Sequence, residues 1–191
     1  MVQSTREIIF QLRGILPLPL LFVTIVWAHP SVRSLIYGGV IVVAGELIRL
    51  WAAGYIRLYR VAAVEAPALV TAGPYAYVRN PLYWGNFFVG FGFVVMSAWW
   101  VAYLLFVATY FGMYAAIVPL EEEFLEKTFG PAYAEYKGKV SRFRPSFQPY
   151  PGASGSFSWR AALGGEWRTV VTHVLVAALF VFRMVLKTYT G

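Results

Sequence analysis

Residues 79–119 read RNPLYWGNFFVGFGFVVMSAWWVAYLLFVATYFGMYAAIVP, and this stretch decides the fold. It holds two apolar segments, Leu82–Met96 and Trp99–Val118, which are separated by a two-residue turn. Asparagine is a preferred N-cap residue and proline suits the first helical position, so Asn80-Pro81 predicts the start of a helix. Both segments approach the roughly 20 residues that a helix needs to cross the hydrocarbon of a bilayer. The stretch therefore predicts a hairpin of two membrane-spanning helices.

Three further apolar stretches flank this hairpin, namely Ile15–Trp27, Leu35–Ile56 and Val170–Leu186. The composition agrees with a membrane protein, because 59% of the 191 residues are hydrophobic and only 13% are charged. A soluble domain of this size needs less apolar surface than this. The sequence thus predicts an all-α, polytopic integral membrane protein with about five transmembrane helices, at roughly 20 residues per span.

The single membrane domain, residues 1–191, divides into parts. Residues 1–56 are expected to hold the first two transmembrane helices, and residues 73–145 a catalytic core that contains the hairpin. Residues 146–168 are rich in Pro, Gly and Ser in their first half and are predicted to be a linker. Residues 169–187 are predicted to form a C-terminal transmembrane helix.

The basic residues are distributed unevenly about the predicted helices. The net charge is +7, and with alternating spans twelve of the 16 Lys and Arg residues fall on one side of the membrane. The positive-inside rule then predicts a multi-pass protein with its amino terminus, and the polar segments beside the hairpin, on the cytoplasmic side. Because topology accounts for the charge, no nucleic-acid partner is expected.

The sequence offers little for metal or thiol chemistry. It has no cysteine, and its two histidines, His29 and His173, are too few and too far apart in sequence for a histidine metal site. We therefore expect no metal ligands.

Two ionisable residues fall inside the second apolar stretch. Glu46 and Arg49 are three residues apart and so share one face of the predicted helix. Ionisable groups inside a bilayer are costly and usually face a partner or a cavity. Either the two residues form an ion pair that ties this helix to its neighbours, or they line a polar region beneath a cofactor site.

Polarity changes abruptly after the hairpin. Its second helix is expected to end near Pro119, and the acidic run Glu121–Glu126 is expected to begin an amphipathic helix in the cytoplasmic interface. Gly130-Pro131 should end that helix. Tyr133 and Tyr136 follow, three apart on one helix face.

These residues together form a recognisable pattern: Arg79-Asn80-Pro81-x-Tyr83-x-Gly85, then after the hairpin Glu121-Glu122-x-x-Leu125-x-x-x-Phe129-Gly130-x-x-Tyr133-x-x-Tyr136-x-x-x-Val140-x-Arg142-x-x-Pro145. The pattern closely resembles the isoprenylcysteine carboxyl methyltransferase family, to which phospholipid N-methyltransferases are related. The resemblance covers about half of the chain, from Arg49 to Pro145. Asn80 stands where that family usually has His, which puts acid–base chemistry at this position in doubt but leaves a hydrogen-bonding role open.

The resemblance implies S-adenosylmethionine as the methyl donor. The implied cofactor-binding residues lie at the start of the hairpin and after it: Arg79, Asn80, Pro81, Leu82, Tyr83, Glu121, Glu122 and Tyr136. Carboxylates can accept hydrogen bonds from ribose hydroxyls or from the ammonium group, and helix amides can bind a carboxylate. Arg142 is the candidate for positioning a carboxylate acceptor, and Glu122 for removing a proton from an amine acceptor.

The methyl acceptor stays open at this point, as a prenylated cysteine carboxylate, a lipid amine or another amphiphile. Two other classes of protein compete with a methyltransferase. Membrane sterol and enone reductases share a similar tyrosine-bearing motif and would bind NADPH, but they are generally longer and lack the Glu-Glu-x-x-Leu-x-x-x-Phe-Gly form. A non-catalytic membrane scaffold would bind no cofactor at all.

Overall fold

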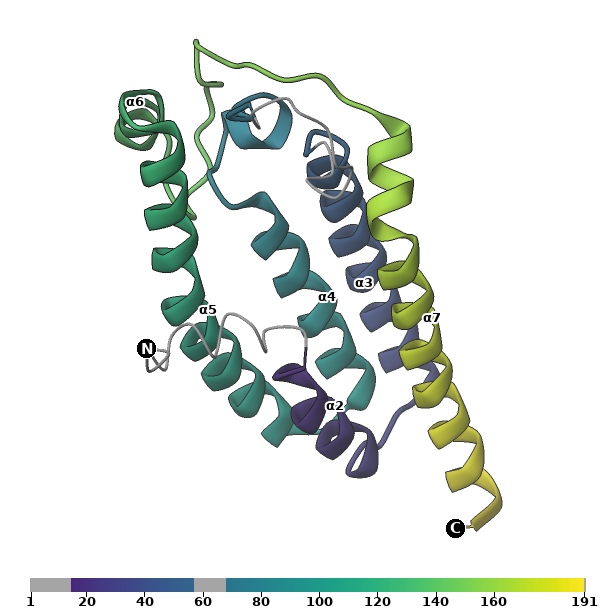
Figure 1. Ribbon diagram of the computed structural model, residues 1–191. Helices are drawn as coiled ribbons and strands as arrows, with labels where there is room; N and C mark the ends of the chain where they lie inside the picture. The colour runs from purple at the N-terminus through teal and green to yellow at the C-terminus, as the bar shows by residue number, and fades with distance from the viewer. Residues whose placement is uncertain (1–14, 57–67, 191) are drawn as a thin grey trace. The chain divides into compact units, whose positions relative to one another are not determined.

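The computed structural model describes residues 15–56 and 68–190. All regular secondary structure in these two ranges is helical, which confirms the predicted all-α class (Figure 1). The elements in chain order are α2 (Pro17–Val26), α3 (Val32–Ala53), the 3-10 helix η1 (Gly73–Ala76), α4 (Pro81–Ser97), α5 (Trp100–Phe129), α6 (Pro131–Lys139) and α7 (Trp159–Thr190). The expected connection over residues 57–67 and the basic residues Arg6 and Arg13 lie outside the described ranges.

Three of these helices, α3, α5 and α7, are long and apolar enough to cross a membrane. α4 has 17 residues and α2 has 10, both shorter than the roughly 20 residues of a typical span. The chain therefore has the helices of a polytopic membrane protein.

The predicted hairpin is confirmed in α4 and α5. Helix α4 begins at Pro81, as the Asn-Pro pair predicts, and ends at Ser97. The turn is closed by Ser97, whose hydroxyl donates to the Val94 carbonyl at 2.7 Å and accepts from the Trp99 amide at 3.2 Å. Ala98 takes the left-handed conformation, with φ of 49°, that so short a connection requires.

The prediction that the second hairpin helix ends near Pro119 is wrong. α5 continues through Pro119 and through the acidic run to Phe129, so no separate interfacial helix begins at Glu121. Proline already has a helical φ, and a helix at membrane depth tolerates the loss of one backbone hydrogen bond. The helix ends instead where Gly130 adopts a φ of 51°, and Pro131 then starts α6. The acidic residues thus occupy the last third of a long helix and not a helix start.

The chain divides into two compact units. The first unit comprises Met1–Val42, Val89–Leu125 and Val174–Gly191, and the second comprises Val43–Phe88 and Glu126–His173. Helices α3, α4, α5 and α7 each contribute one part to each unit.

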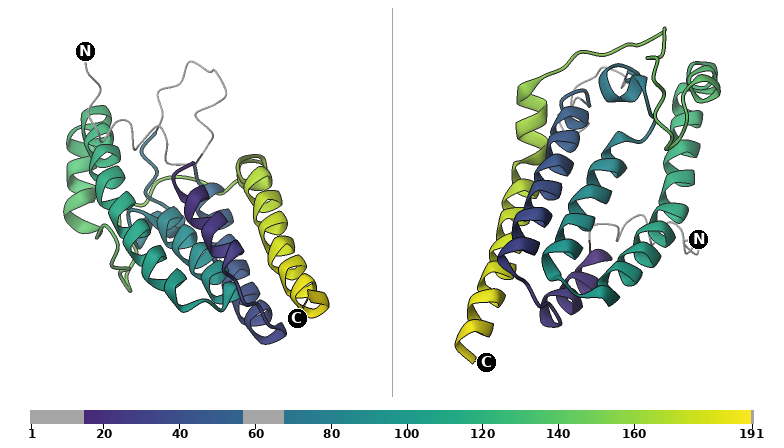
Figure 2. Two further views of the ribbon diagram at one scale, coloured as in Figure 1. Left: turned by 90° about the horizontal axis from the view of Figure 1, so that it is seen from below. Right: turned by 180° about the vertical axis from the view of Figure 1, so that it is seen from behind.

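The core of the first unit is built around α3, α4 and α7. Val42, Met96 and Phe180 are buried there, and the rings of Phe93 and Phe180 stack with centroids 6.2 Å apart. Figures 1 and 2 show α3 and α4 side by side. Glycine makes this approach possible, because a Cβ on Gly92 would lie 2.7 Å from the Gly38 carbonyl oxygen.

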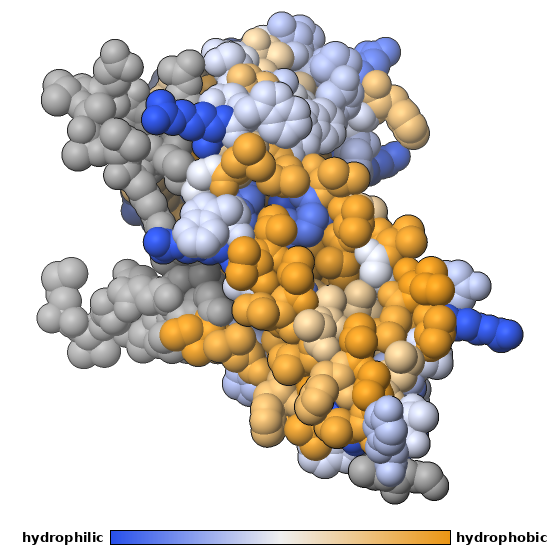
Figure 3. Space-filling model, turned by 90° about the vertical axis from the view of Figure 1, so that its right-hand side faces the viewer, coloured by the Kyte–Doolittle hydropathy of each residue, from blue (hydrophilic) through white to orange (hydrophobic). Residues whose placement is uncertain are grey.

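The outer surfaces of the helices are apolar. In α7 the side chains of Leu175 and Phe182 are 61% and 59% exposed, and in α3 that of Val40 is 65% exposed. Orange, apolar residues predominate on the face shown in Figure 3. Large apolar side chains on the outside of a helix are typical of contact with lipid.

The segment that precedes α7 belongs to the second unit. The Tyr150 amide donates to the Ala76 carbonyl at 2.9 Å, and the Ser146 amide donates to the Tyr77 carbonyl at 2.9 Å. The expected linker, residues 146–168, is shorter than predicted because α7 begins at Trp159. The charged residues in 160–168 hid the first turns of this helix, since a search for apolar spans passes over them.

Candidate functional site

The Arg-Asn-Pro motif lies at the start of α4, in the second unit, and the segment after α6 is hydrogen-bonded to it. Arg79 donates from its amide to the Ser141 carbonyl and from Nη1 to the Lys137 carbonyl, both at 3.0 Å. The Asn80 side-chain amide donates to the Arg142 carbonyl at 3.2 Å. The structure therefore brings together four of the predicted site residues, Arg79, Asn80, Arg142 and Tyr136, from segments more than fifty residues apart.

The next residues of the motif differ in their burial. Pro81 is fully buried, whereas Leu82 and Tyr83 are half-buried. The Tyr83 amide donates to the Asn80 carbonyl at 3.2 Å, as expected in the first turn of a helix. Leu82 and Tyr83 thus retain accessible surface beside the hydrogen-bonded cluster.

Tyr136 anchors α6 in the second unit. It is 3% exposed, and its hydroxyl donates to the Tyr75 carbonyl at 2.6 Å. Burial raises the pKa of the Tyr136 phenol above its ordinary value, so the hydroxyl stays protonated as this donor. Its ring contacts those of Tyr133 and Tyr150, with centroids 6.1 and 5.4 Å away. Tyr136 and Tyr133, which is 1% exposed, are packed in the interior, where they form no open aromatic wall.

The two predicted acidic residues lie on α5, in the first unit. Glu122 is only 3% exposed, whereas the adjacent Glu123 is exposed. A carboxylate with so little access to water needs hydrogen-bond donors or a cation. This burial singles out Glu122 from the acidic run. Glu121 is half-buried.

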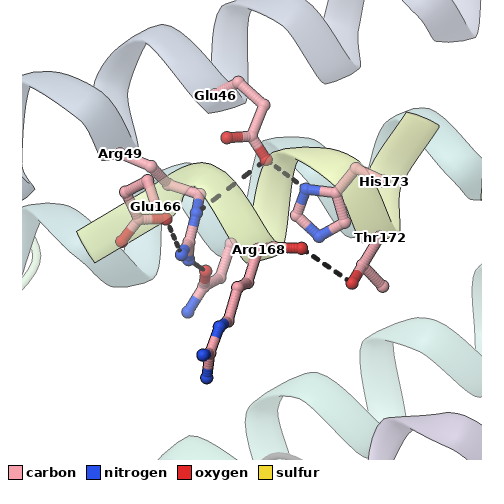
Figure 4. A network of polar contacts seen from close by, with 7 residues as sticks. Glu46, Arg49, Glu166, Arg168, Thr172 and His173 are labelled. Carbon is pink, nitrogen blue, oxygen red and sulfur yellow. Dashed lines mark hydrogen bonds and ion pairs between the residues drawn. The ribbon is translucent and has the colours of Figure 1, made fainter. Parts of the chain in front are cut away.

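A second polar cluster lies in the second unit and joins α3, α4 and α7 (Figure 4). Arg49 donates to Glu166 and to the Asn86 side-chain carbonyl, and its Nε lies 3.9 Å from Glu46. His173 contacts the Glu46 carboxylate through Nδ1. The charged side chains of Glu46, Arg49 and Glu166 are 10 to 12% exposed. The prediction that Glu46 and Arg49 form an ion pair tying their helix to its neighbours is thereby confirmed.

Sequence reasoning missed Glu166, His173 and Asn86 as members of this cluster. The available signal was the spacing of Glu166 and His173, which are seven residues apart and so share one face of a helix. Residue 166 was assigned to the linker, so this spacing carried no weight.

Gly85, the last residue of the motif, is explained by the same cluster. A Cβ at Gly85 would lie 2.4 Å from Arg49 Cγ and 3.0 Å from the Gly45 carbonyl oxygen. The missing side chain lets α3 pack against α4 and leaves room for the arginine stem.

Two cavities of the second unit adjoin the first turn of α4. One, of about 380 Å³, is lined by Ala53, Ile56, Leu82, Ala161, Gly164, Gly165, Glu166, Trp167 and Arg168. The other, of about 320 Å³, is lined by Ile48, Trp51, Pro74, Tyr77, Val78, Pro81, Trp84, Phe88 and Pro145. The first has a polar part and an apolar part, and the second is apolar and aromatic.

A helical chain with three helices able to cross a membrane and a polar cluster at the start of a fourth belongs to the polytopic membrane proteins. Residues 33–132, about half of the chain, match the family described as "Phospholipid methyltransferase". The chain belongs to this family. The resemblance seen in the sequence motif is thereby confirmed.

Three relatives illustrate the range of similar proteins. Cobalt-zinc-cadmium resistance protein CzcN of Cupriavidus metallidurans is 29% identical over 155 residues, which cover 81% of this chain and 67% of that protein. Protein-S-isoprenylcysteine O-methyltransferase A of Arabidopsis thaliana is 33% identical over 110 residues, covering 55% of this chain and 56% of that enzyme. Protein-S-isoprenylcysteine O-methyltransferase of Schizosaccharomyces pombe is 38% identical over 72 residues, covering 38% of this chain and 30% of that enzyme.

The chain thus spans about half, or less, of the length of these two methyltransferases. No solved structure matches it.

Proposed function

We propose that this chain is an S-adenosylmethionine-dependent membrane methyltransferase that acts on a lipophilic or amphiphilic acceptor. Family membership supports this activity, and so does the similarity to two enzymes named as isoprenylcysteine methyltransferases. The observation that carries the proposal is the set of hydrogen bonds by which Arg79 and Asn80 hold the segment that contains Arg142.

The proposed topology has about five spans, with α2 and α4 crossing the membrane beside α3, α5 and α7 at roughly 20 residues per full span. The excess of basic residues beside the motif favours a cytoplasmic location for the site. A cytoplasmic site suits a soluble, charged methyl donor, while an acceptor with a lipid chain reaches it from the bilayer.

The donor set of the chain fits S-adenosylmethionine. When bound, this cosubstrate supplies a methyl group already activated on a sulfonium cation. Glu122 combines a carboxylate with low exposure and so suits the ammonium or the ribose hydroxyls. The amides and side chains of Asn80, Leu82 and Tyr83 are assigned to the same ligand. Glu121 and Glu122 are included because of the sequence pattern, and Tyr136 contributes by fixing α6.

The protein's own part in this reaction is mostly to position the acceptor and to exclude water. Arg142 is half-buried, its backbone is fixed by Asn80, and a guanidinium can bind a carboxylate in bidentate fashion. Arg142 therefore positions a carboxylate acceptor. An amine acceptor must lose a proton, and Glu122 is the base assigned to that step.

Calorimetric titration of the full chain in detergent with S-adenosylhomocysteine tests the proposal. Wild type should bind, and Glu122→Ala should lose binding by about tenfold or more, because a charge-assisted hydrogen bond is removed. Glu123→Ala is the matched control, since this neighbour carries the same charge but is exposed. It should bind as wild type does.

Three results would contradict the proposal. Binding of NADPH in place of S-adenosylhomocysteine would assign the chain to the reductases. Binding of neither ligand by folded protein would favour a scaffold. Equal losses in the two glutamate variants would remove Glu122 from the site.

A further inference from the structure

The cavity of about 380 Å³ beside α4 extends beyond the family motif. Leu82, at the start of α4, lines one part of it, and Gly164, Gly165, Glu166 and Arg168 of α7 line another. The α7 residues lie outside the segment that matches the family, residues 33–132. The volume is in the range of pockets that hold small molecules.

Glu166 contributes a carboxylate to this cavity. Its side chain is 10% exposed, and its Oε2 accepts a hydrogen bond from Arg49. Within the described part of the chain Oε1 has no hydrogen-bond partner. A carboxylate so far removed from water gains stability from a second donor, and a primary ammonium offers three.

Arg168 contributes a cation to the same cavity. Its guanidinium lies 5.3 Å from the centroid of the Trp167 ring and forms no ion pair with any carboxylate among the described residues. In Figure 4 its side chain points away from the cluster around Arg49. An arginine in this position is free to bind a carboxylate or a phosphate.

We propose that this cavity binds a zwitterionic group, with its primary ammonium at Glu166 and its anionic part at Arg168. The apolar side of the cavity, which includes Ala53 and Leu82, would receive the rest of the ligand. Two ligands carry this chemistry, the methionine end of the methyl donor and the phosphoethanolamine head of a membrane lipid. The first source rests on the proposed function, and the second does not.

Binding by the full chain in detergent distinguishes the two sources. One arm is calorimetric titration with S-adenosylhomocysteine. The other is native mass spectrometry with equimolar phosphatidylethanolamine and phosphatidylglycerol, which share the phosphodiester and differ in the ammonium. The variants are Arg168→Gln and Glu166→Gln, and Arg160→Gln is the control, because it is exposed, precedes the cavity on the same helix and does not line it.

For one of the two ligands, we expect Arg168→Gln to weaken binding by about fivefold and Glu166→Gln by about tenfold, with Arg160→Gln unchanged. The ligand that responds identifies the source. If Glu166→Gln does not fold, the exposed Arg168 still carries the test. Unchanged binding of both ligands by Arg168→Gln, or retention of phosphatidylglycerol equal to phosphatidylethanolamine without any response to S-adenosylhomocysteine, would overturn the inference. If wild type and Arg168→Gln bind S-adenosylhomocysteine equally, the proposed function survives and the zwitterion site does not.

Discussion

Replacing Gly92 by alanine should separate α3 from α4 in the first unit. The added Cβ would lie 2.7 Å from the Gly38 carbonyl oxygen and 2.9 Å from the Val42 amide nitrogen. Both neighbours are backbone atoms, so a rotamer change cannot relieve the contact. The first distance is short of ordinary carbon contact by roughly 0.7 Å or more. Overpacking of this kind costs about 1–3 kcal/mol.

The measurement is the free energy of unfolding in mixed micelles of detergent and SDS, followed by tryptophan fluorescence. Gly112→Ala is the control, since a Cβ at this helical position of α5 meets nothing within 4 Å. Alanine is the better helix former by about 0.5–1 kcal/mol, so the control should unfold no earlier than wild type. If Gly92→Ala is as stable as Gly112→Ala, the close approach of the two helices at this glycine is refuted.

Three further predictions concern the second unit. Arg49→Met should lower the free energy of unfolding by about 3 kcal/mol or more, because Glu166 would keep a buried carboxylate without its cation; the exposed Arg33→Met should change it little, and equal losses would contradict the argument. Tyr136→Phe should cost about 1 kcal/mol for one lost hydrogen bond, against no loss in Tyr189→Phe, which alters an 85% exposed ring. Because burial raises the pKa of Tyr136, the unfolded chain releases this proton at lower pH than the folded one, and stability should fall as pH rises from about 9 to about 11. Tyr136→Phe should show a smaller fall, measured by the same unfolding titration at both pH values.

Local rules predicted those elements whose boundaries are set by local chemistry. The Asn-Pro pair placed the start of α4, and Gly130-Pro131 placed the break between α5 and α6. Both signals act through backbone conformation, which depends on the residue itself and its immediate neighbours. Pro119 misled for the same reason, because whether a helix tolerates a proline depends on its surroundings and not on the proline alone.

The polar contacts of α7 could not be predicted in this way. Glu166 is 117 residues from Arg49 in sequence, and only the packing of α7 against α3 makes it a partner. Hydropathy identified the apolar part of α7 and excluded its charged first turns, which hold the residues that contact the cluster. Helices that bury charged groups against one another are thus shortened in a reading based on apolar length alone.

The substitution at position 80 changes what the motif can contribute. Asn80 donates its side-chain amide to the Arg142 carbonyl, and this contact needs a hydrogen-bond donor but no titrating group. Arg79 adds two further bonds to the same segment. The motif therefore holds the segment of Arg142 against the start of α4 by bonds that stay the same across the physiological pH range. An imidazole could supply the same donor, but it would add a protonation step near neutral pH. The asparagine retains the structural function of this position and removes its dependence on pH, which is why acid–base chemistry in this chain is assigned to Glu122.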